Sequence, residues 1–411
     1  MTAPMALSYE EENELRIKRE KKLSIMLLVL LGSLYLTNFS FVLSSYVSIN
    51  YSLISKIIKF MPILATVYAL PSLYYSQYDK RFITLIVVLF GFYAWSGIMV
   101  FNSHYTEYLK YFITVCLPCM IATYAIEDYN YFLTKLKYVS IVFSFFALYI
   151  LLVSQNSVDT DSDYFMSYSY SSSIMTMALF NDVPVKKFCK PLVFCGAVIY
   201  ITSIVLLGAR GPLLTILLFL VSKNISSPKR NLAFKAVMVV ALGILLMTYE
   251  KIFSFLNVLA LSHGIKSRTL ASFSGETISM SGRENYYSFY LGEIFANPLK
   301  FRGIASDWDK MGYPHQIFIE LSYQLGAIGI IASIIIIVAI VYMIIKQYRN
   351  PFAQTCNIFF LGIGIFTLLL SNSFWKSLQF WMWLGYMFNA WKGIANNASI
   401  GNQFLQLRQH G

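Results

Sequence analysis

Long apolar segments alternate with short polar segments along nearly the whole chain. Many apolar segments approach 20 residues, the length that an α-helix needs to cross the hydrocarbon core of a bilayer. They are continuously apolar rather than alternately apolar and polar, which favours helices over half-buried strands. We therefore expect an all-α, polytopic integral membrane protein with about 12 transmembrane helices. The candidate spans are residues 23–42, 60–75, 82–101, 109–126, 138–154, 164–180, 191–207, 212–222, 236–253, 327–345, 355–370 and 375–391.

Basic residues mark every second turn between these spans. Counted from a cytoplasmic N-terminus, the even-numbered turns carry lysine or arginine, whereas turn 46–55 is uncharged and turn 156–163 carries only acids. Because cytoplasmic loops of membrane proteins are rich in lysine and arginine, this alternation places both termini in the cytoplasm. The basic residues of the even turns are Lys80, Arg81, Lys135, Lys137, Lys186, Lys187, Lys190, Lys223, Lys229, Arg230, Lys346 and Arg349.

The expected topology divides the chain into three parts. Residues 1–22 form a cytoplasmic N-terminal segment of alternating acids and bases, which predicts a solvated helix. Residues 23–391 form the transmembrane domain, and residues 392–411 a cytoplasmic C-terminal tail. The first apolar run is long and has no small-residue cleavage site before it ends, so we expect it to be retained as a helix rather than removed as a signal peptide.

One loop on the expected outer, periplasmic face is much longer than the others. Residues 254–314 carry charges of both signs, and long loops of this kind are usually functional or disordered. Within the loop, residues 286–295 place tyrosine, phenylalanine and leucine at helical spacing. This spacing predicts an amphipathic helix that lies on the membrane or across the helix bundle.

Composition narrows the function classes. Hydrophobic residues make up 57% of the 411 residues and charged residues 13%, against roughly 25% charged residues in soluble domains. The net charge of +12 could suit nucleic acid, but basic residues in short loops serve to orient helices, and we expect no nucleic-acid partner. Cys116 and Cys119 have metal or redox spacing, yet they lie in an apolar segment, where a packed helix kinked at Pro118 is expected.

Arg210 is the most informative single residue. It interrupts the apolar stretch 191–221 within the break Gly208-Ala209-Arg210-Gly211-Pro212. A guanidinium at membrane depth is costly and normally faces a polar cavity or a partner. The helix that follows, residues 212–227, spans about 24 Å at 1.5 Å per residue, less than the ~30 Å hydrocarbon core. Arg210 is therefore expected in a recess below the outer surface, where a lipid-linked phosphate would suit it.

His315 and Arg283 are the next candidates for chemistry. His315 follows Tyr313-Pro314 and is expected to open the helix of the tenth span; a neutral histidine is a competent general base near pH 7. Glu320 lies about 140° around such a helix, so no direct pair along it is expected. Arg283 follows Gly282 at the start of the amphipathic helix. No metal constellation is apparent, since Asp307 and Asp309 form only an isolated D-x-D.

Three blocks on the expected outer face resemble the bacterial O-antigen polymerases and O-antigen ligases, over roughly residues 165–345. Gln316 departs from the asparagine, and Ala209 from the serine, that the family usually has at the matching positions. The blocks are Gly208-Ala209-Arg210-Gly211-Pro212; Ser281-Gly282-Arg283 with the helix after it and Asn297-Pro298-Leu299; and Tyr313-Pro314-His315-Gln316-Ile317-Phe318-Ile319-Glu320-Leu321, which closes with Gly326-Ala327-Ile328-Gly329.

The resemblance implies a lipid-carrier-dependent glycosyltransferase with a GT-C-like fold in the bacterial inner membrane, its active site facing the periplasm. Such an enzyme moves sugar from undecaprenyl pyrophosphate to an acceptor hydroxyl without a metal ion or other cofactor. On this resemblance, Arg210 and Arg283 would clamp the pyrophosphate, and His315 would take the acceptor proton. A single base without a covalent intermediate implies inversion at the anomeric carbon. Further candidates for the site are Arg302, Arg268 and Glu320.

Three functions remain open from the sequence. An O-antigen polymerase accepts a second lipid-linked repeat unit, and the block around His315 with Arg283 upstream resembles polymerases most. An O-antigen ligase, which accepts the lipid A–core, is the first alternative. A polysaccharide lipid flippase or transporter is the second; it would need broken helices in both halves, and a Gly/Pro-flanked charge occurs only at Arg210. The expected partners are an undecaprenyl-pyrophosphate-linked oligosaccharide, the bilayer and a chain-length regulator.

Overall fold

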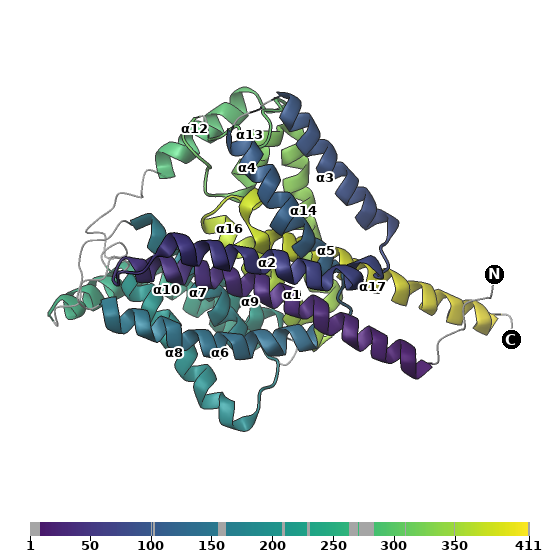
Figure 1. Ribbon diagram of the computed structural model, residues 1–411, viewed down its shortest axis with the longest axis horizontal. Coiled ribbons are helices and arrows are strands. Elements are labelled where there is room, and N and C mark those ends of the chain that lie inside the picture. The colour runs from purple at the N-terminus through teal and green to yellow at the C-terminus, as the bar shows by residue number, and fades with distance from the viewer. Residues whose placement is uncertain are drawn as a thin grey trace.

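The computed structural model describes most of the chain, and all regular secondary structure in the described part is helical (Figure 1). The expected all-α class is therefore confirmed for these residues. They are 9–99, 101, 103–154, 162–207, 210–227, 231–262, 270, 283–308, 310–348 and 350–409.

The first half of the chain forms eight α-helices, one π-helical turn and one 3-10 turn among its described residues. They are α1 (Tyr9–Ser44), α2 (Tyr51–Tyr74), α3 (Lys80–Met99), α4 (Ser103–Tyr111), the π turn η1 (Phe112–Cys116), α5 (Leu117–Ala125), α6 (Tyr129–Ser154), α7 (Ser162–Phe180), the 3-10 turn η2 (Lys187–Cys189) and α8 (Lys190–Leu207).

The second half contains the helices that surround the candidate site. They are α9 (Arg210–Ser226), α10 (Leu232–Ser262), α12 (Arg283–Ala296), α13 (Ile317–Leu325), α14 (Ala327–Gln347), α15 (Pro351–Leu361), the π turn η3 (Gly362–Phe366), α16 (Thr367–Leu370), the 3-10 turn η4 (Phe374–Lys376) and α17 (Leu378–Gln409).

Eight helical stretches in the described part are long and apolar enough to cross a membrane, so the protein is a polytopic membrane protein. All twelve segments expected from the sequence overlap helices, but α7, α9, α10 and α17 are not among the eight. The count of twelve thus stays a prediction. The eight stretches are Glu10–Ser44, Tyr51–Tyr74, Lys80–Met99, His104–Ala125, Tyr129–Ser154, Lys187–Leu207, Ala327–Gln347 and Pro351–Leu370.

Both ends of the chain continue the helices of the bundle. α1 runs without interruption across the expected boundary after residue 22, and α17 runs past residue 391 to Gln409. Glu20, which is buried, accepts hydrogen bonds from the backbone nitrogens of Glu127 (3.1 Å) and Asp128 (3.5 Å), in the turn before α6. The N-terminal segment is therefore docked on the bundle by this carboxylate, rather than being wholly solvated. The start of α1 and the end of α17 lie on the same side of the molecule, at the right of Figure 1.

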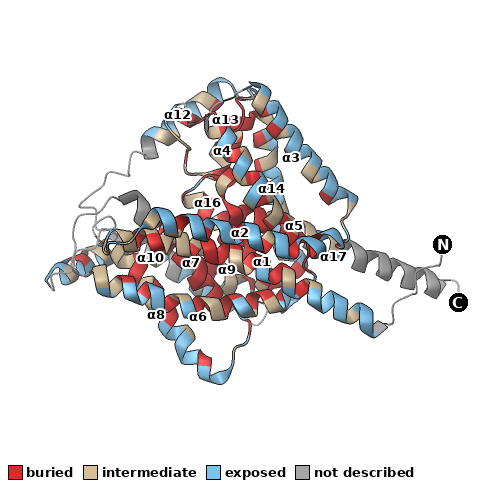
Figure 2. Ribbon diagram, in the orientation of Figure 1, coloured by how far each residue is buried: buried red, intermediate tan, exposed pale blue. Residues whose placement is uncertain are grey.

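The core lies where the central helices meet, and Figure 2 shows the buried residues gathered there. Trp381 and Trp383 of α17 are almost fully buried, and α17 packs against α5. Cys116 and Cys119 are buried free thiols in this packing. The π turn η1 ends two residues before Pro118, whose ring nitrogen cannot donate a helical hydrogen bond, so the helix widens there instead of ending.

The long loop of residues 254–314 contains the expected amphipathic helix. α12 covers residues 286–295; Tyr290 and Ile294 on one face are buried, whereas Leu291 and Phe295 are exposed. The buried face packs on α13, where the Tyr290 ring meets the Tyr323 ring at 4.7 Å between centroids. The first residues of the expected loop prolong α10 to Ser262.

His315 does not open the helix of the tenth span, contrary to the sequence-based expectation. α13 ends at Leu325, and α14 starts as a separate helix at Ala327. Gly326 joins them with φ of 58°, and a Cβ at this position would lie 2.6 Å from the carbonyl oxygen of Lys300. The apolar span expected from the sequence starts at residue 327, but hydropathy alone did not show that the helix breaks before it.

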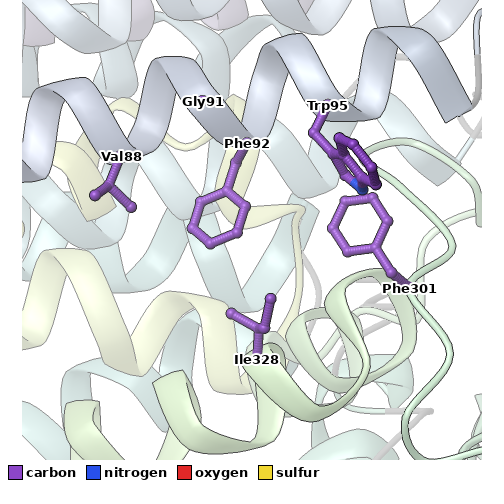
Figure 3. A pocket seen from close by; sticks show the side chains of 6 residues that line it. All are labelled: Val88, Gly91, Phe92, Trp95, Phe301 and Ile328. Carbon is purple, nitrogen blue, oxygen red and sulfur yellow. The ribbon is translucent and has the colours of Figure 1, made fainter.

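An apolar cavity of about 430 Å³ separates α3 from the start of α14 (Figure 3). Trp95 and Phe301 lie at one end of it, and Val88, Phe92 and Ile328 line the remainder. α3 diverges from the rest of the bundle beside this cavity, at the upper right of Figure 1. The apolar lining suits hydrocarbon, as expected between two candidate membrane helices.

Candidate active site

His315 occupies a strained turn directly before α13. Its backbone φ is 57°, a left-handed conformation uncommon for non-glycine residues. Its Nδ1 lies 3.5 Å from Oγ of Ser371, the residue after α16. Its ring centroid lies 4.2 Å from that of Tyr313 and 6.0 Å from that of Tyr286 in α12. Segments far apart in the sequence therefore surround one imidazole.

Gln316 explains how the chain turns from this histidine into a helix. It is the N-cap of α13, and its Oε1 accepts a hydrogen bond from the backbone nitrogen of Ile319 at 2.7 Å. Asparagine is among the preferred N-cap residues because its side-chain oxygen makes the same kind of bond. The glutamine that follows His315 thus performs a capping task that asparagine could also perform.

Backbone strain gathers around His315. In the part of the chain that the structure describes, the non-glycine residues with positive φ are Ala305 (64°), His315 (57°) and Asn372 (75°). Asn372 follows the serine that contacts His315, and Ala305 is buried two residues before Asp307. Strained conformations persist only where the surroundings hold them, and they cluster at functional sites.

Arg210 starts α9 beside the same segment. The next residue, Gly211, lies so close to Tyr170 that a Cβ would clash with the tyrosine hydroxyl, and the same Cβ would lie 3.7 Å from Leu370. Because Leu370 directly precedes Ser371, the start of α9 and the His315 imidazole adjoin consecutive residues. The structure therefore brings the Arg210 and His315 regions together, and Arg210 itself is half-buried.

The other predicted arginines differ in how far the structure locates them. Arg283 is the first residue of α12, one turn before Tyr286, whose ring lies 6.0 Å from that of His315. The side chain of Arg283 and the whole of Arg268 fall outside the described part. Arg302 is buried, and its guanidinium donates to the carbonyl oxygens of Glu293 at 2.8 Å and Tyr323 at 3.2 Å. Arg302 therefore joins α12 to α13.

Glu320 lies inside the protein rather than on an accessible surface. Its carboxyl accepts hydrogen bonds from Oγ of Ser373 and, at 3.2 Å, from the backbone nitrogen of Phe374. Burial raises the pKa of Glu320 well above its ordinary value, and the nearby carboxyl of Asp307 raises it further. The uncharged form is thus favoured, and Glu320 and His315 both contact the segment after α16.

Asp307 belongs to the same buried network. Gln324 of α13 donates from Nε2 to Oδ1 of Asp307 at 2.8 Å, and its Oε1 accepts from the indole nitrogen of Trp375 at 2.6 Å. Tyr290 of α12 donates to the backbone oxygen of Asp307 at 3.2 Å. The network ties the long loop before α13, α13 itself and the segment after α16 into one unit, and so fixes the turn that carries His315.

An ion pair and a group of rings border this unit. Nζ of Lys376 lies 2.9 Å from Oε1 of Glu107 and 4.6 Å from the ring centroid of Tyr108. The indole nitrogen of Trp308 donates to the Tyr108 hydroxyl at 2.5 Å, and the Trp308 ring lies 5.5 Å from that of Tyr313. Through Trp308, the Tyr313 ring next to His315 is thereby connected to α4.

Sequence reasoning missed the residues that support the histidine. Ser371 and Ser373 lie in a short turn between two expected spans, and such a turn looks like any other connection. Gln324 looks like one polar residue in an apolar stretch. Asp307 gave only a weak D-x-D signal, and Asp309 lies outside the described part. The one available cue was the density of polar residues from Ser371 to Ser377.

Comparisons with known proteins add no identity to this geometry: no family model, no curated protein and no solved structure matches the chain.

Proposed function

We propose that the protein is an O-antigen polymerase, a glycosyltransferase that moves a growing glycan from undecaprenyl pyrophosphate to an incoming lipid-linked repeat unit. The observation that carries the proposal is the meeting of the start of α9, with Arg210, and the His315 turn at Leu370 and Ser371. A cation and a potential base, separated by a long stretch of sequence, thus adjoin one short segment.

The charges at Arg210 favour an anionic substrate. Arg210 is the first residue of the 17-residue helix α9, and the N-terminus of a helix carries a partial positive charge. An arginine there adds like charge, which is unfavourable unless an anion lies between or beside them. Pyrophosphate meets this need, because helix N-termini and arginine forks both bind phosphate oxygens.

The proposed reaction is a single displacement. His315 accepts the proton of the acceptor hydroxyl while that oxygen forms a bond to the anomeric carbon of the donor sugar. The bond between the anomeric carbon and the pyrophosphate oxygen breaks, and the pyrophosphate leaves with the electron pair. Arg210 and Arg283 offset the charge that develops on it, without a metal ion. One displacement inverts the anomeric carbon.

The finer topology belongs to the same proposal. Twelve spans, with both termini in the cytoplasm, place the His315 turn on the periplasmic side of a bacterial inner membrane. The start of α1 and the end of α17 lie on one side of the molecule, which supports this arrangement. The fold would be of the GT-C-like type, and a chain-length regulator would be a partner.

Deleting the gene and separating the lipopolysaccharide on a gel tests the function. A single repeat on the core supports a polymerase; bare core with retained lipid-linked polymer would instead show a ligase. Unchanged polymer length would contradict both. Complementation with His315→Ala should fail, whereas His104→Ala should restore the polymer. His104 is a matched control because it is half-buried like His315 and stacks on Trp308, with 4.8 Å between ring centroids.

A further inference from the structure

A second polar site lies at the other end of α9. A pocket of about 510 Å³ opens between the turn after α7, the last turns of α9 and the first turns of α15. The basic turns of the sequence place this end on the cytoplasmic face. Its polar lining includes Asn181, Asp182 and Lys223, and its apolar lining includes Phe219 and Ile358. The pocket thus offers charge next to hydrocarbon.

Two ammonium groups converge on the turn after α7. Lys223 donates to the carbonyl oxygen of Phe180 at 2.5 Å and pairs with Asp182 at 2.7 Å. Lys137 donates to the carbonyl oxygen of Asn181 at 2.8 Å and to that of Val183 at 3.0 Å. Lys223 lines the pocket, whereas Lys137 is buried outside the lining. Two cations beside one carboxylate leave this side of the pocket net positive. The positive end of α15, which begins at Pro351 on the pocket lining, adds to this potential.

Asn181 provides an independent sign of a ligand. The residue is 5% exposed, and its Oδ1 accepts a hydrogen bond from the backbone nitrogen of Val183 at 3.0 Å. Its Nδ2 is buried and has no hydrogen-bond partner among the described residues. Leaving a buried amide donor unsatisfied is unfavourable, and an acceptor oxygen in the pocket beside Asn181 would remove this cost after a small rotation of the amide.

We propose that the pocket binds the headgroup of a zwitterionic aminophospholipid from the inner leaflet. The phosphodiester takes the inner position, next to Lys223 and the Asn181 amide. The primary ammonium pairs with the carboxylate of Asp182, whose side chain is 63% exposed at the rim. Phe219 and Ile358 contact the start of the acyl chains. Basic pockets between helices on the cytoplasmic side are known places for lipid headgroups.

The order of charges selects this headgroup class. A positive inner wall and a negative rim complement an inner phosphate and an outer ammonium. An anionic headgroup without an amine would leave Asp182 without a cation from the ligand. A quaternary ammonium has no N–H to donate to the carboxylate. The proposal rests on the pocket and on the proposed topology, and it does not depend on the transfer reaction at the other end.

The test compares lipids on the purified full chain. Retention of phosphatidylethanolamine and phosphatidylglycerol by native mass spectrometry, together with thermal unfolding in nanodiscs of each lipid, should show a preference for phosphatidylethanolamine. Asp182→Asn should lower that preference roughly tenfold, and Lys223→Met should weaken binding of both lipids. Glu107→Gln is the matched control, because the Glu107–Lys376 pair has the same side-chain exposures, 63% and 26%, at the outer end.

Four results would overturn the proposal. The wild-type protein could bind both lipids equally, or Glu107→Gln could lower the preference as far as Asp182→Asn. Phosphatidylcholine binding as tightly as phosphatidylethanolamine would remove the ammonium–carboxylate contact. Equal stabilisation by soluble glycerophosphoethanolamine would show that the pocket takes a free phosphodiester rather than a membrane lipid.

Discussion

The two ends of the bundle carry ion pairs of the same exposure but differ in the buried acids and the backbone strain around these pairs. Glu107–Lys376 lies at the end that we propose faces outward, and Asp182–Lys223 at the end that we propose faces inward; we call these the outer and inner ends. Both pairs are half-open to solvent. Around the outer pair lie two fully buried acids and the strained residues Ala305, His315 and Asn372. Around the inner pair, the described backbone shows no non-glycine residue with positive φ.

If both proposals hold, this difference distinguishes a reacting site from a binding site. Strain and buried acids cost free energy, and they persist only where the surroundings specify one geometry. At the inner end, helix ends supply charges and a pocket without backbone strain at any described non-glycine residue. Strain, rather than charge, therefore supports our proposal that the outer end is the reacting one.

Arg210→Lys should break the outer site most severely. Lysine keeps the charge but loses the planar fork that engages two phosphate oxygens. We expect transfer of sugar to fall roughly 10²-fold or more, with normal expression. Arg81→Lys, an exposed arginine at the start of α3, is the control. Wild-type levels of surface polymer from Arg210→Lys would remove this arginine from the donor site.

Arg302→Met should sharpen the distinction between reacting and supporting residues. The substitution leaves carbonyl oxygens of Glu293 and Tyr323 without their donor, which should cost about 1–3 kcal/mol of stability. Thermal unfolding in detergent measures the loss, and Arg16→Met, exposed on α1, should have no such effect. An Arg302→Met protein of full stability but little transfer would assign Arg302 to the substrate instead.

Glu320→Gln should change the pH dependence of stability at the outer end, with a smaller overall effect. The pKa of Glu320 is raised in the folded protein by burial and by Asp307. The contribution of Glu320 to the free energy of unfolding is therefore complete below its unfolded-state pKa. This contribution is lost as the pH rises through its folded-state pKa. The substituted glutamine carries no charge at any pH, so the stability of the variant relative to the wild type should increase as the pH rises. A constant difference in melting temperature across roughly pH 5 to 9 would contradict a raised pKa.

The sequence predicted the helices because transmembrane apolarity is a local property. The twelve expected segments overlap helices, and the amphipathic pattern of residues 286–295 located α12. The break at Gly326 escaped prediction because it depends on the distant carbonyl oxygen of Lys300. Hydropathy cannot report such a contact.

The candidate site was predictable only in part. Arg210 and His315 could be selected as a cation and a base in unusual places, and the structure brings their regions together. The supporting role of Arg302 could not be read, because its partners are carbonyl oxygens of two other segments. The contact between His315 and Ser371 likewise depends on how α16 ends.

The most direct test of the account is the rate at which purified His315→Ala protein elongates lipid-linked repeat units. A general base typically contributes about 10²–10⁴-fold in rate. The account predicts a monodisperse protein that binds the lipid-linked donor as the wild type does, and that transfers sugar slower by this factor, while His104→Ala transfers at the wild-type rate. A His315→Ala protein that elongates the repeats as fast as the wild type would contradict the central claim that the His315 turn is the reacting end of the molecule.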